Sequence, residues 1–584
     1  MVTLTIDGKS VTVEEGTTIL EAAKQINIRI PTLCHLNLED LKMLNQVASC
    51  RICVVEVEGR CNLAPSCATP AAEGMRVRTN SKRVLAARRT LLELMLSDHP
   101  FDCLMCEKST NCELQRLAYE FGINRERFKW EVNTFDIDTT SRALKRDPNK
   151  CIMCRRCETM CSQVQTVGVL TGFGRGFEAI VGPAEMNSLV DTNCTYCGQC
   201  VSVCPTAALT GVGYIPEVWE ALFDETKTVV VQVAPAIRAA IGEEFGMEPG
   251  VPIPGKLAAG LRRLGFDAVF DTTFGADLTI VEEAKEILDR VEAGDNLPIL
   301  TSCCPGWINF LEFQFPELKH VASTCKSPQQ MVGTMAKTYY AEKIGVAPED
   351  VVVVSVMPCI AKKYEAARPE HRTNGIPDVD YVITTRELSK MLKEAGIDLR
   401  FMDDEPFDDP LGESTGAGVI FGATGGVLEA ALRTVYEEVN RRELEDVNFT
   451  AVRGMEGVKE ATIPINGKTV NVAAASGLGN ARRILENIER GTSKYDVIEI
   501  MACPGGCING GGQPYSEERA ERIQQRIQAL YTVDEGKGCR KSHRNPAVLR
   551  LYEEYLGEPG RPRAHELLHT CYFDGWCRDK TSAS

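Results

Sequence analysis

The sequence lacks the features of a secreted, membrane-spanning or nucleic-acid-binding protein. Residues 1–15 (MVTLTIDGKSVTVEE) have neither the basic start nor the apolar core of a secretory signal. No run of about 20 uncharged apolar residues is present that could span a bilayer. The formal net charge of −16 at pH 7 argues against broad binding to nucleic acid. We therefore expect a cytoplasmic protein with no membrane and no nucleic-acid partner.

Cysteine, in contrast, is abundant, with 25 residues in a chain of 584. A reducing cytoplasm disfavours a disulfide framework, and closely spaced Cys-x-x-Cys motifs favour metal binding. The chain is also long enough for several domains with their own cores. We therefore expect a metalloprotein with several domains.

The first 80 residues predict a small domain that holds a 2Fe–2S cluster. VTLTIDGKSVTV alternates around Asp7-Gly8, which predicts a hairpin, and TTILEAAKQI predicts a helix capped by Thr17 or Thr18. The cysteine spacing resembles the plant-type ferredoxin pattern, although its first gap is longer. The predicted ligands are Cys34, Cys50, Cys53 and Cys67. Cys61 lies between them and is interpreted as a bystander, because four positions are already filled.

A basic stretch, residues 76–90 (RVRTNSKRVLAARRT), is predicted to be helical. Its charges either form a solvated helix face or dock an acidic electron carrier.

Residues 81–140 predict a 4Fe–4S cluster with one histidine ligand. The segment DHPFDCLMCEKSTNCELQ contains His99, Cys103, Cys106 and Cys112. It resembles the His-ligated cluster in the large iron–sulfur subunit of respiratory NADH dehydrogenase and in certain hydrogenases. A neutral imidazole in place of an anionic thiolate should raise the reduction potential, as in Rieske centres. The alternative is that His99 only packs or caps a helix.

Residues 141–212 predict two further 4Fe–4S clusters. CIMCRRCETMC and CTYCGQCVSVCP form the bacterial two-cluster ferredoxin run, in which the fourth cysteine of each motif ligates the other cluster. One predicted ligand set is Cys151, Cys154, Cys157 and Cys204; the other is Cys194, Cys197, Cys200 and Cys161. A structural zinc site is the alternative, which the repeated triplet disfavours. Together with the first two sites these clusters would form an electron wire in series.

After residue 212 the composition changes to apolar strands that alternate with helical stretches. Three predicted strands end at a cysteine, and a fourth ends at Ala-Pro: LPILTSCCPGW, VVVVSVMPCIAKK, YDVIEIMACPGGCING and TVVVQVAPAIR. Continuous apolar strands indicate sheets buried on both faces, with a site at the carboxyl ends of the strands. The remote cysteines should therefore converge on one pocket. Cys303 and Cys304 are adjacent, so on an extended chain they point to opposite sides and cannot bind one metal in the same way.

These cysteine motifs carry a specific resemblance. TSCCPGW (301–307), MPCIAKK (357–363) and MACPGGCINGGGQP (501–514), with the upstream DTTFGADLTIVEEA (271–284), look like the signatures of iron–iron hydrogenases. The N-terminal cysteine motifs match the longer, multi-cluster members, so the resemblance covers nearly the whole chain. It implies the reaction 2 H⁺ + 2 e⁻ ⇌ H₂. It also implies an H-cluster, a 4Fe–4S cube joined through a cysteine sulfur to a diiron subsite with CO, cyanide and a dithiolate amine, inserted by maturases.

The resemblance also implies roles for individual residues. The implied cube ligands are Cys304, Cys359, Cys503 and Cys507, with Cys507 as the bridge to the diiron subsite. Cys303 would be the proton donor and acceptor, with a relay through Glu283, Ser323 and Glu286 and with Arg290 at its surface end. Lys362 would pair with a cyanide, and the implied pocket lining is Ala234, Pro235, Gln329, Met357, Phe421 and Met501. Without the resemblance, the glutamates would be read as a solvated helix face and the lining residues as ordinary core.

The expected fold is modular α+β. A β-grasp domain (1–80), a His-Cys 4Fe–4S domain (81–140) and a two-cluster ferredoxin domain (141–212) precede a two-lobed α/β catalytic domain (213–515) and a helical tail (516–584). YSEERAERIQQRIQALY predicts a polar helix in the tail. Cys325, Cys539 and the spare pair Cys571 and Cys577 have no assigned role.

The electron partner stays open between two arrangements. Similar chains act alone with ferredoxin, or as catalytic subunits beside NAD(P)- and flavin-binding subunits, sometimes with electron bifurcation; the layout resembles the second arrangement. GFGRGF (172–177), SGLGNAR (476–482) and FGATGGV (421–427) lack nucleotide-binding spacing, so this chain should bind neither flavin nor NAD(P). Two rivals remain. A non-catalytic iron–sulfur assembly or sensory protein could keep the cube cysteines, and an NADH dehydrogenase subunit would explain only the N-terminal third.

Overall fold

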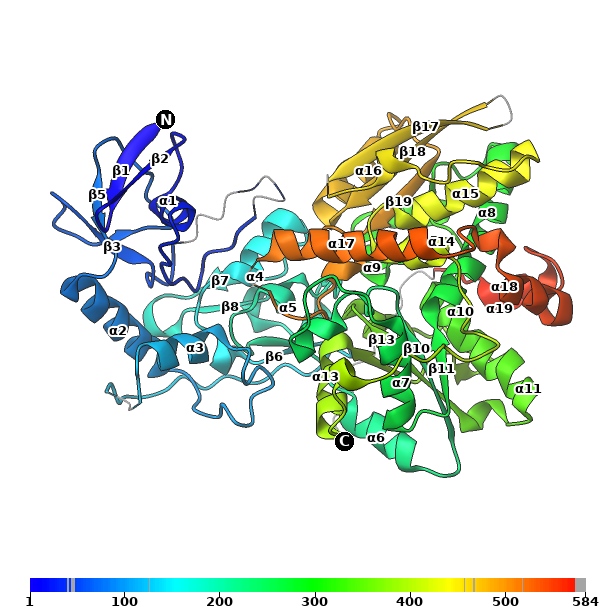
Figure 1. The fold of residues 1–584 in the computed structure, drawn as a ribbon, viewed down its shortest axis with the longest axis horizontal. Coiled ribbons are helices and arrows are strands. Elements are labelled where there is room, and N and C mark those ends of the chain that lie inside the picture. Colours follow the sequence, from blue (N-terminus) through cyan, green and yellow to red (C-terminus); the bar gives the residue numbers. More distant parts are fainter. Residues whose placement is uncertain are drawn as a thin grey trace.

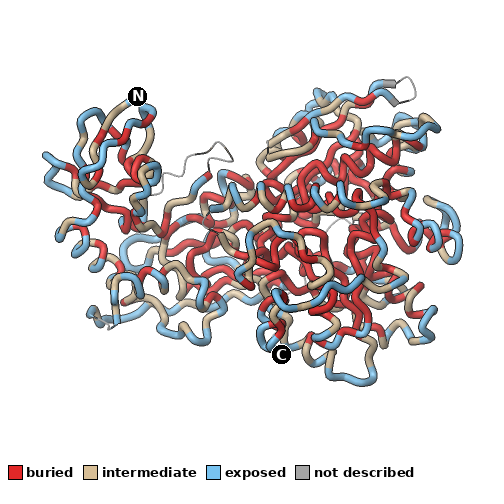
Figure 2. Tube along the Cα trace, in the orientation of Figure 1, coloured by how far each residue is buried: buried red, intermediate tan, exposed pale blue. Residues whose placement is uncertain are grey.

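The computed structural model describes residues 1–38, 41, 43, 48–124, 127–455, 457–465, 468–516 and 518–572. The N-terminal elements lie at one end of the elongated molecule, and two stacked sheets with their helices form the other end (Figure 1). Buried residues are densest around these two sheets, while the N-terminal domain has a separate, smaller core (Figure 2). Within the described residues, no helix combines the length and hydrophobicity needed to cross a membrane.

The N-terminal domain is a five-stranded mixed sheet in the order β2-β1-β5-β3-β4. Its strands are β1 (Val2–Ile6), β2 (Lys9–Val13), β3 (Val54–Val57), β4 (Ala64–Pro65) and β5 (Arg76–Arg78). Asp7 and Gly8 both have positive φ, 47° and 84°, which suits the tight turn between β1 and β2. Helix α1 (Ile19–Gln25) begins after Thr18, whose hydroxyl forms a capping box with Glu21. The predicted hairpin is confirmed, and Thr18 is the cap of the two predicted candidates, Thr17 and Thr18.

The basic stretch is only partly helical, so that prediction was wrong at its start. Residues Arg76–Arg78 form β5, because they pair with β1, and helix α2 (Lys82–Leu96) begins later. Arg83, Arg88 and Arg89 donate to backbone carbonyls of neighbouring segments. Several of these charges are therefore used inside the fold and do not form one free basic face.

The cysteine-rich modules that follow consist of short helices and strands. They are α3 (Glu113–Glu120), β6 (Leu144–Arg146), α4 (Arg156–Thr159), β7 (Thr171–Phe173), β8 (Ile180–Gly182), α5 (Gln199–Val203) and β9 (Leu209–Gly211). The two Cys-x-x-Cys-x-x-Cys loops repeat one backbone pattern. Met153 and Tyr196 both have φ of 54°, and Arg155 and Gly198 follow with 59° and 73°. Each loop then enters a short helix, which is the expected symmetry of a duplicated ferredoxin motif.

The catalytic part contains two four-stranded sheets. One has the order β11-β10-β13-β16 and the other β12-β19-β18-β17. The first is wholly parallel, and in the second only β17 and β18 are antiparallel. The strands are β10 (Thr228–Val233), β11 (Ala268–Asp271), β12 (Ile299–Leu300), β13 (Val351–Met357), β16 (Tyr381–Thr384), β17 (Val458–Ile465), β18 (Lys468–Ser476) and β19 (Val497–Met501). The four apolar strands predicted from sequence are confirmed as β10, β12, β13 and β19.

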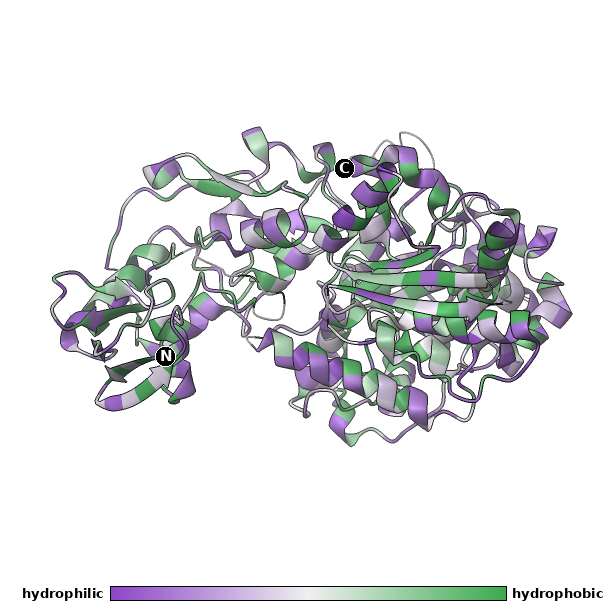
Figure 3. Ribbon diagram, turned by 90° about the horizontal axis from the view of Figure 1, so that it is seen from above, coloured by the Kyte–Doolittle hydropathy of each residue, from purple (hydrophilic) through white to green (hydrophobic). Residues whose placement is uncertain are grey.

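Helices cover both faces of these sheets, and the strands between them are mainly hydrophobic (Figure 3). The longer helices are α6 (Ile215–Phe223), α7 (Pro254–Leu264), α8 (Thr272–Ala293), α9 (Pro305–Gln314), α10 (Pro328–Met335), α13 (Thr385–Glu394), α15 (Gly426–Asn440) and α16 (Leu478–Glu489). The shorter elements are α11 (Ala341–Ile344), α12 (Ala361–Ala366), α14 (Gly416–Val419), β14 (Arg372–Thr373) and β15 (Ile376–Pro377). Parallel strands buried in this way place their carboxyl ends at a common edge.

The tail packs onto the catalytic part as helices α17 (Arg519–Gly536), α18 (Pro546–Leu551) and α19 (Pro562–Leu568). The predicted helix is present as α17, which lies across the catalytic part in Figure 1. Its Ile523 and Leu530 are buried against the α14 segment. Cys571 is exposed, and Cys577 lies outside the described residues.

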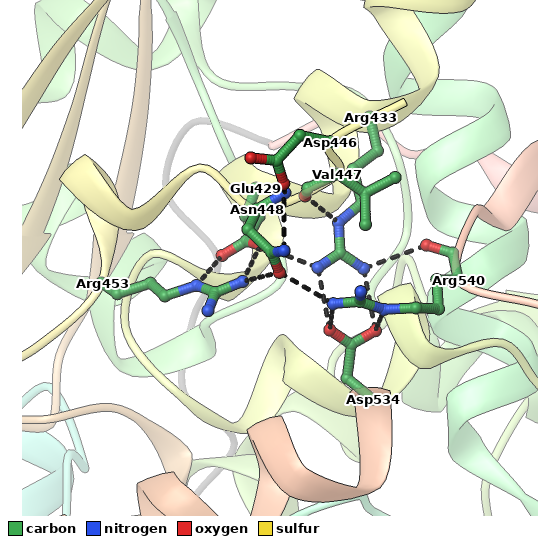
Figure 4. Close-up of polar contacts among 8 residues, drawn as sticks. All are labelled: Glu429, Arg433, Asp446, Val447, Asn448, Arg453, Asp534 and Arg540. Atoms are coloured by element: carbon green, nitrogen blue, oxygen red, sulfur yellow. Dashed lines mark hydrogen bonds and ion pairs between the residues drawn. The ribbon is translucent and has the colours of Figure 1, made fainter. Parts of the chain in front are cut away.

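A buried ion-pair network fastens the tail to helix α15 (Figure 4). Arg433 is fully buried and pairs with Glu429 at 2.7 Å and with Asp534 of α17 at 2.9 Å. Arg453 pairs with Glu429, and Arg540 pairs with Asp534. Each buried carboxylate therefore faces two guanidinium groups.

Replacing Arg433 by methionine should lower the free energy of unfolding by about 3–5 kcal/mol, because it leaves buried carboxylates uncompensated. Thermal unfolding of the anaerobic protein measures this. Arg400→Met is the matched control, since Arg400 pairs with Asp398 on the surface, where the loss of an ion pair should change stability little. Equal unfolding temperatures for the two variants would contradict this role of the network.

Candidate active site and cluster-binding sites

The four cysteines predicted to hold a 2Fe–2S cluster lie together in the N-terminal domain. Cys34, Cys50, Cys53 and Cys67 are all buried. The sulfurs of Cys53 and Cys67 are 3.3 Å apart, and the Cys34 thiol contacts those of Cys50 and Cys67. Cys61 is exposed and outside this group. Four buried thiols gathered in this way suit a thiophilic metal.

His99 lies near the loop that carries Cys103 and Cys106 and precedes α3. Its Nδ1 is buried and has no hydrogen-bond partner, and burial lowers the pKa of the ring, which favours the neutral imidazole that binds metals. Cys112 caps α3 through its sulfur, which accepts from the Gln115 N–H at 3.5 Å. The unpaired Nδ1 favours a metal-ligand role for His99 over a helix-capping role, because a capping nitrogen would have a hydrogen-bond partner.

The two ferredoxin motifs enclose two separate cavities. The first, of about 450 Å³, is lined by Cys151, Cys154, Cys157 and Cys204. The second, of about 430 Å³, is lined by Cys161, Cys194, Cys197 and Cys200. The structure thus groups the fourth cysteine of each motif with the three cysteines of the other. Burial raises the pKa of Cys154 and of Cys197, the latter to about 12, so these thiols need a cation to become thiolates.

Contacts between the modules define an order of sites. Cys154 packs in one cluster with Cys34 and Cys50, so the 2Fe–2S site adjoins the first cavity. The His99 module adjoins the same cavity, because Lys108 donates to the Cys204 carbonyl. The order is therefore branched, with two N-terminal sites meeting at the first cavity, and not a single series as predicted.

The second cavity adjoins a larger one in the catalytic part. The Cys503 sulfur lies 4.0 Å from the Cys197 carbonyl oxygen. Gly306 lies against Cys197 as well, since a Cβ on Gly306 would be 3.4 Å from the Cys197 Cα. The second cavity thus adjoins the site that the converging strands form.

This larger cavity, of about 730 Å³, lies at the carboxyl ends of β10, β13 and β19. Its walls include Ala234, Pro235, Gln329, Met357, Phe421, Met501 and Lys362, and five sulfurs from Cys303, Cys304, Cys359, Cys503 and Cys507. The structure therefore brings together every implied cube ligand and every implied lining residue. Gln329 also presents a buried Oε1 with no hydrogen-bond partner.

The adjacent thiols of Cys303 and Cys304 have different neighbours. The Cys304 sulfur accepts from the Ala502 N–H at 3.4 Å and lies near Cys359, Cys503 and Cys507, the other implied cube ligands. Cys303 lies beside Glu283. Burial raises the pKa of the Cys303 thiol well above its usual value, and the nearby Glu283 carboxyl makes the second-largest contribution. The two cysteines share one cavity, yet only Cys303 faces the acid.

Lys362 is held at the cavity wall by a residue that the sequence analysis missed. Its Nζ donates to the Cys303 carbonyl at 3.1 Å and to the Glu365 carboxylate at 2.8 Å. Gln329 also donates to Glu365, at 2.9 Å. The spacing of Lys362 and Glu365, three residues apart on α12, was the available signal.

The implied proton relay forms a continuous path from the cavity outward. Glu283 is buried between Cys303 and Ser323, and burial raises its pKa to about 8, with a further contribution from Glu286. Ser323 Oγ donates to Glu286 Oε2 at 2.8 Å, and Arg290 pairs with Glu286 at 2.5 Å. Arg290 is half-buried rather than fully exposed. A carboxyl that is neutral near pH 7 can pass protons in either direction.

Glycines near Cys507 allow backbone segments of the cavity wall to pack closely. Gly506 has φ of 108°, and a Cβ there would lie 2.6 Å from the Thr424 nitrogen; on Gly510 it would lie 2.2 Å from the Pro358 oxygen. The close approach that these glycines permit is thus between backbone segments of the cavity wall.

Five stretches of the chain match known sequence families. Residues 227–511 match the iron only hydrogenase large subunit, C-terminal domain, and 520–575 match the iron hydrogenase small subunit. Residues 1–82 match the 2Fe-2S iron-sulfur cluster binding domain, 88–127 the NADH-ubiquinone oxidoreductase-G iron-sulfur binding region, and 189–210 the 4Fe-4S binding domain. The match to the small subunit thus covers most of the predicted tail, which the sequence analysis had also compared with hydrogenases of the NADP-reducing type.

Whole-chain relatives agree with these matches. The chain is 58% identical to the NADP-reducing hydrogenase subunit HndD of Solidesulfovibrio fructosivorans, over 98% of this chain and 99% of that protein. It is 42% identical to iron hydrogenase 1 of Clostridium pasteurianum, over 98% and 100%. The cytosolic iron-sulfur assembly component 3 of Bos taurus is 32% identical over 65% of this chain and 83% of that protein.

A solved structure matches the catalytic part. The apo [FeFe]-hydrogenase HydA1 from Chlamydomonas reinhardtii superposes with a TM-score of 0.56 and 46% identity, over 61% of this chain and 99% of that chain. Together with the whole-chain similarity to HndD, the converging cysteines identify an oxidoreductase. The chain belongs to the iron-only ([FeFe]) hydrogenase family, with iron–sulfur domains at its N-terminus.

Proposed function

We propose that this chain catalyses 2 H⁺ + 2 e⁻ ⇌ H₂ as the catalytic subunit of an NAD(P)-linked hydrogenase. The observation that carries the proposal is the cavity of about 730 Å³. Four cysteines that would hold the cube line this cavity, and a fifth, Cys303, lies beside the buried Glu283. The cavity also adjoins a second cysteine-lined cavity through Cys503 and Cys197.

The residues present fit an H-cluster. Four thiols are the soft donors that iron–sulfur clusters require, and the cavity is larger than the two cavities of the ferredoxin motifs. Cys304, Cys359, Cys503 and Cys507 would hold the cube, with Cys507 next to the diiron subsite that maturases insert. When bound, this group supplies the metal centre at which protons are reduced and H₂ is split. Lys362 and the orphaned Gln329 Oε1 provide a cation and a polar contact for its ligands.

The N-terminal sites would deliver electrons to this cavity. The 2Fe–2S site and the His99 site both adjoin the cluster held by Cys151, Cys154, Cys157 and Cys204. The cluster held by Cys194, Cys197, Cys200 and Cys161 adjoins the catalytic cavity through Cys197. Electrons could therefore enter at either the 2Fe–2S site or the His99 site, and both routes would lead to the catalytic cavity. Such an arrangement suits an enzyme that exchanges electrons with more than one carrier.

Replacing Cys204 by serine tests the crossed ligand sets. We expect loss of the cluster held by Cys151, Cys154 and Cys157, with the Cys194 cluster kept, because Cys204 lines the first cavity. Iron content and the electron paramagnetic resonance spectrum of the reduced protein measure this. Cys61→Ser is the control and should retain all iron, since Cys61 is exposed. Loss of the Cys194 cluster in Cys204→Ser would reverse the assignment.

Protons would move through side chains of this chain. Cys303 gives or takes a proton at the cavity, Glu283 exchanges it with Ser323, and Ser323 with Glu286. Arg290 holds Glu286 at the outer end. The path needs no ionised group in the interior, since the raised pKa of Glu283 keeps it neutral near pH 7.

The partners we propose are ferredoxin and NAD(P)- and flavin-binding subunits. HndD is by name a subunit of an NADP-reducing hydrogenase, and residues 88–127 match a region of an NADH-ubiquinone oxidoreductase subunit. Strictly anaerobic isolation from the native cells tests this. Flavin-containing chains should co-purify, and H₂ should drive NAD(P) reduction; a strict requirement for ferredoxin would indicate bifurcation. A lone chain that exchanges electrons only with ferredoxin would contradict the complex.

A non-catalytic assembly role is the alternative, favoured by the 32% identity to an assembly component. Catalysis is the better supported role, because Cys303 and Lys362 line the cavity and the acid relay leads outward from Cys303. A scaffold needs the cube cysteines but not a path for protons.

A further inference from the structure

Three side chains outside the catalytic cavity meet at the outer end of the relay. Glu286 comes from α8, Cys325 follows α9, and His569 follows α19 of the tail. Cys325 and His569 form an isolated β-bridge, so the backbone itself holds them side by side. One potential ligand atom from each residue lies within 4.8 Å of the other two. The proposed reaction uses neither Cys325 nor His569.

Cys325 is a buried thiol aimed at a carboxylate. Its side chain is 0% exposed, and its sulfur lies 3.7 Å from Glu286 Oε2. Burial, followed by the charges of Glu286, Glu283 and Glu282, raises the pKa of this thiol well above its usual value. A divalent cation at this point would compensate both the carboxylate and a thiolate.

His569 already has the hydrogen bond that orients a metal-binding imidazole. Its Nε2 lies 3.0 Å from the Glu282 carboxylate, which also accepts from the Tyr552 hydroxyl and from the Gly560 N–H at 2.9 Å. Nε2–H therefore donates to Glu282. Nδ1 keeps its lone pair and faces the Thr324 hydroxyl at 2.8 Å. Carboxylate–histidine pairs of this kind fix the tautomer and ring orientation at metal sites.

We propose that Glu286, Cys325 and His569 form a binding site for a thiophilic divalent cation of the Zn²⁺ class. One sulfur, one imidazole nitrogen and one carboxylate oxygen are the donors that Zn²⁺ prefers, with a fourth position for water. The Thr324 hydroxyl would release Nδ1 and donate to Glu286 alone, 3.2 Å away. Cation binding releases the Cys325 proton, so the affinity for the cation should increase as the pH rises.

Occupation of this site would stop proton transfer. The Glu286 carboxylate accepts the Ser323 hydrogen bond in the relay. A cation bound to this carboxylate would prevent Glu286 from accepting or releasing a proton. This consequence rests on the proposed function, whereas the binding itself does not. The site would make the enzyme sensitive to free zinc.

The test uses the full chain with all clusters loaded, under anaerobic conditions, and zinc chloride as the probe. Equilibrium dialysis with metal analysis counts bound zinc, and anomalous scattering from a soaked crystal locates it. We expect one zinc between the three residues, with affinity at least about tenfold lower in Cys325→Ala and in His569→Asn. Cys539→Ala is the matched control, because the Cys539 thiol donates to the Lys541 carbonyl at 3.5 Å and is not one of the three grouped residues. Unchanged zinc binding in Cys325→Ala and His569→Asn would overturn the proposal.

Activity separates this inference from the proposed function. Zinc should inhibit H₂ formation by the unmodified chain, a chelator should reverse the inhibition while the cluster absorption stays constant, and Cys325→Ala should need at least about tenfold more zinc. Zinc that binds between the three residues without inhibiting supports the site and contradicts the relay through Glu286. Inhibition that is equal in Cys325→Ala and the unmodified chain overturns the link between this site and activity.

Discussion

Replacing Cys303 by alanine should lower H₂ formation by about 10²–10⁴-fold, the range that one positioned proton donor contributes. Cys303 faces the cavity and is the cysteine there that lies beside Glu283. Alanine has no proton to give, and its smaller side chain leaves the four cube cysteines in place. The measurement is H₂ formation from a strong chemical reductant, which bypasses the partner subunits.

The matched control for Cys303→Ala is Cys539→Ala, because Cys539 lies outside every cysteine group described above. Iron content and the infrared bands of CO and cyanide should be the same in both variants. Normal H₂ formation by Cys303→Ala would show that protons reach the metal by another route. Loss of the infrared bands would instead make Cys303 a ligand of the cofactor.

Glu283→Gln should have the second-largest effect, a loss of about 10²-fold or more in H₂ formation. Glutamine keeps the size of the side chain but cannot release a proton to Cys303. The unmodified enzyme should also lose activity above about pH 8, where the buried Glu283 carboxyl ionises. The glutamine variant should show no such transition.

The raised pKa of Glu283 also predicts a change in stability. Its value of about 8 in the folded chain exceeds the ordinary 4.5, so between these pH values the folded state binds more protons than the unfolded state. The free energy of unfolding should therefore fall as the pH rises through this window, and Glu283→Gln should remove that part of the fall. Parallel stability profiles for the two proteins from pH 5 to 8 would contradict the buried, neutral acid.

Local patterns were enough to predict much of the fold. Asp7-Gly8 specified a hairpin and Thr18 a helix cap, because both depend on neighbouring residues alone. The strands before Cys304, Cys359 and Cys503 were visible as apolar runs. The convergence of these cysteines followed from the rule that parallel strands present their carboxyl ends at one edge.

Long-range contacts could not be predicted in this way. Arg76–Arg78 reads as part of a helix, yet pairing with β1 makes it a strand. Arg433 and Asp534 are far apart in the chain, and nothing local marks either as buried. Glu282 and His569 likewise reveal their contact only once the tail has docked on α8.

The roles of single cluster ligands, the relay residues and a cytoplasmic location stay predictions. Their geometry is specific enough to be tested one residue at a time, because each cysteine group occupies its own cavity or module.

Infrared spectroscopy of the anaerobically purified chain under H₂ is the most direct measurement. We expect bands of metal-bound CO and cyanide that shift when argon is replaced by H₂, together with reduction of the N-terminal clusters by H₂. A protein with its iron–sulfur clusters intact, isolated from cells that contain the maturases, that shows no such bands and no response to H₂ would contradict the function proposed here.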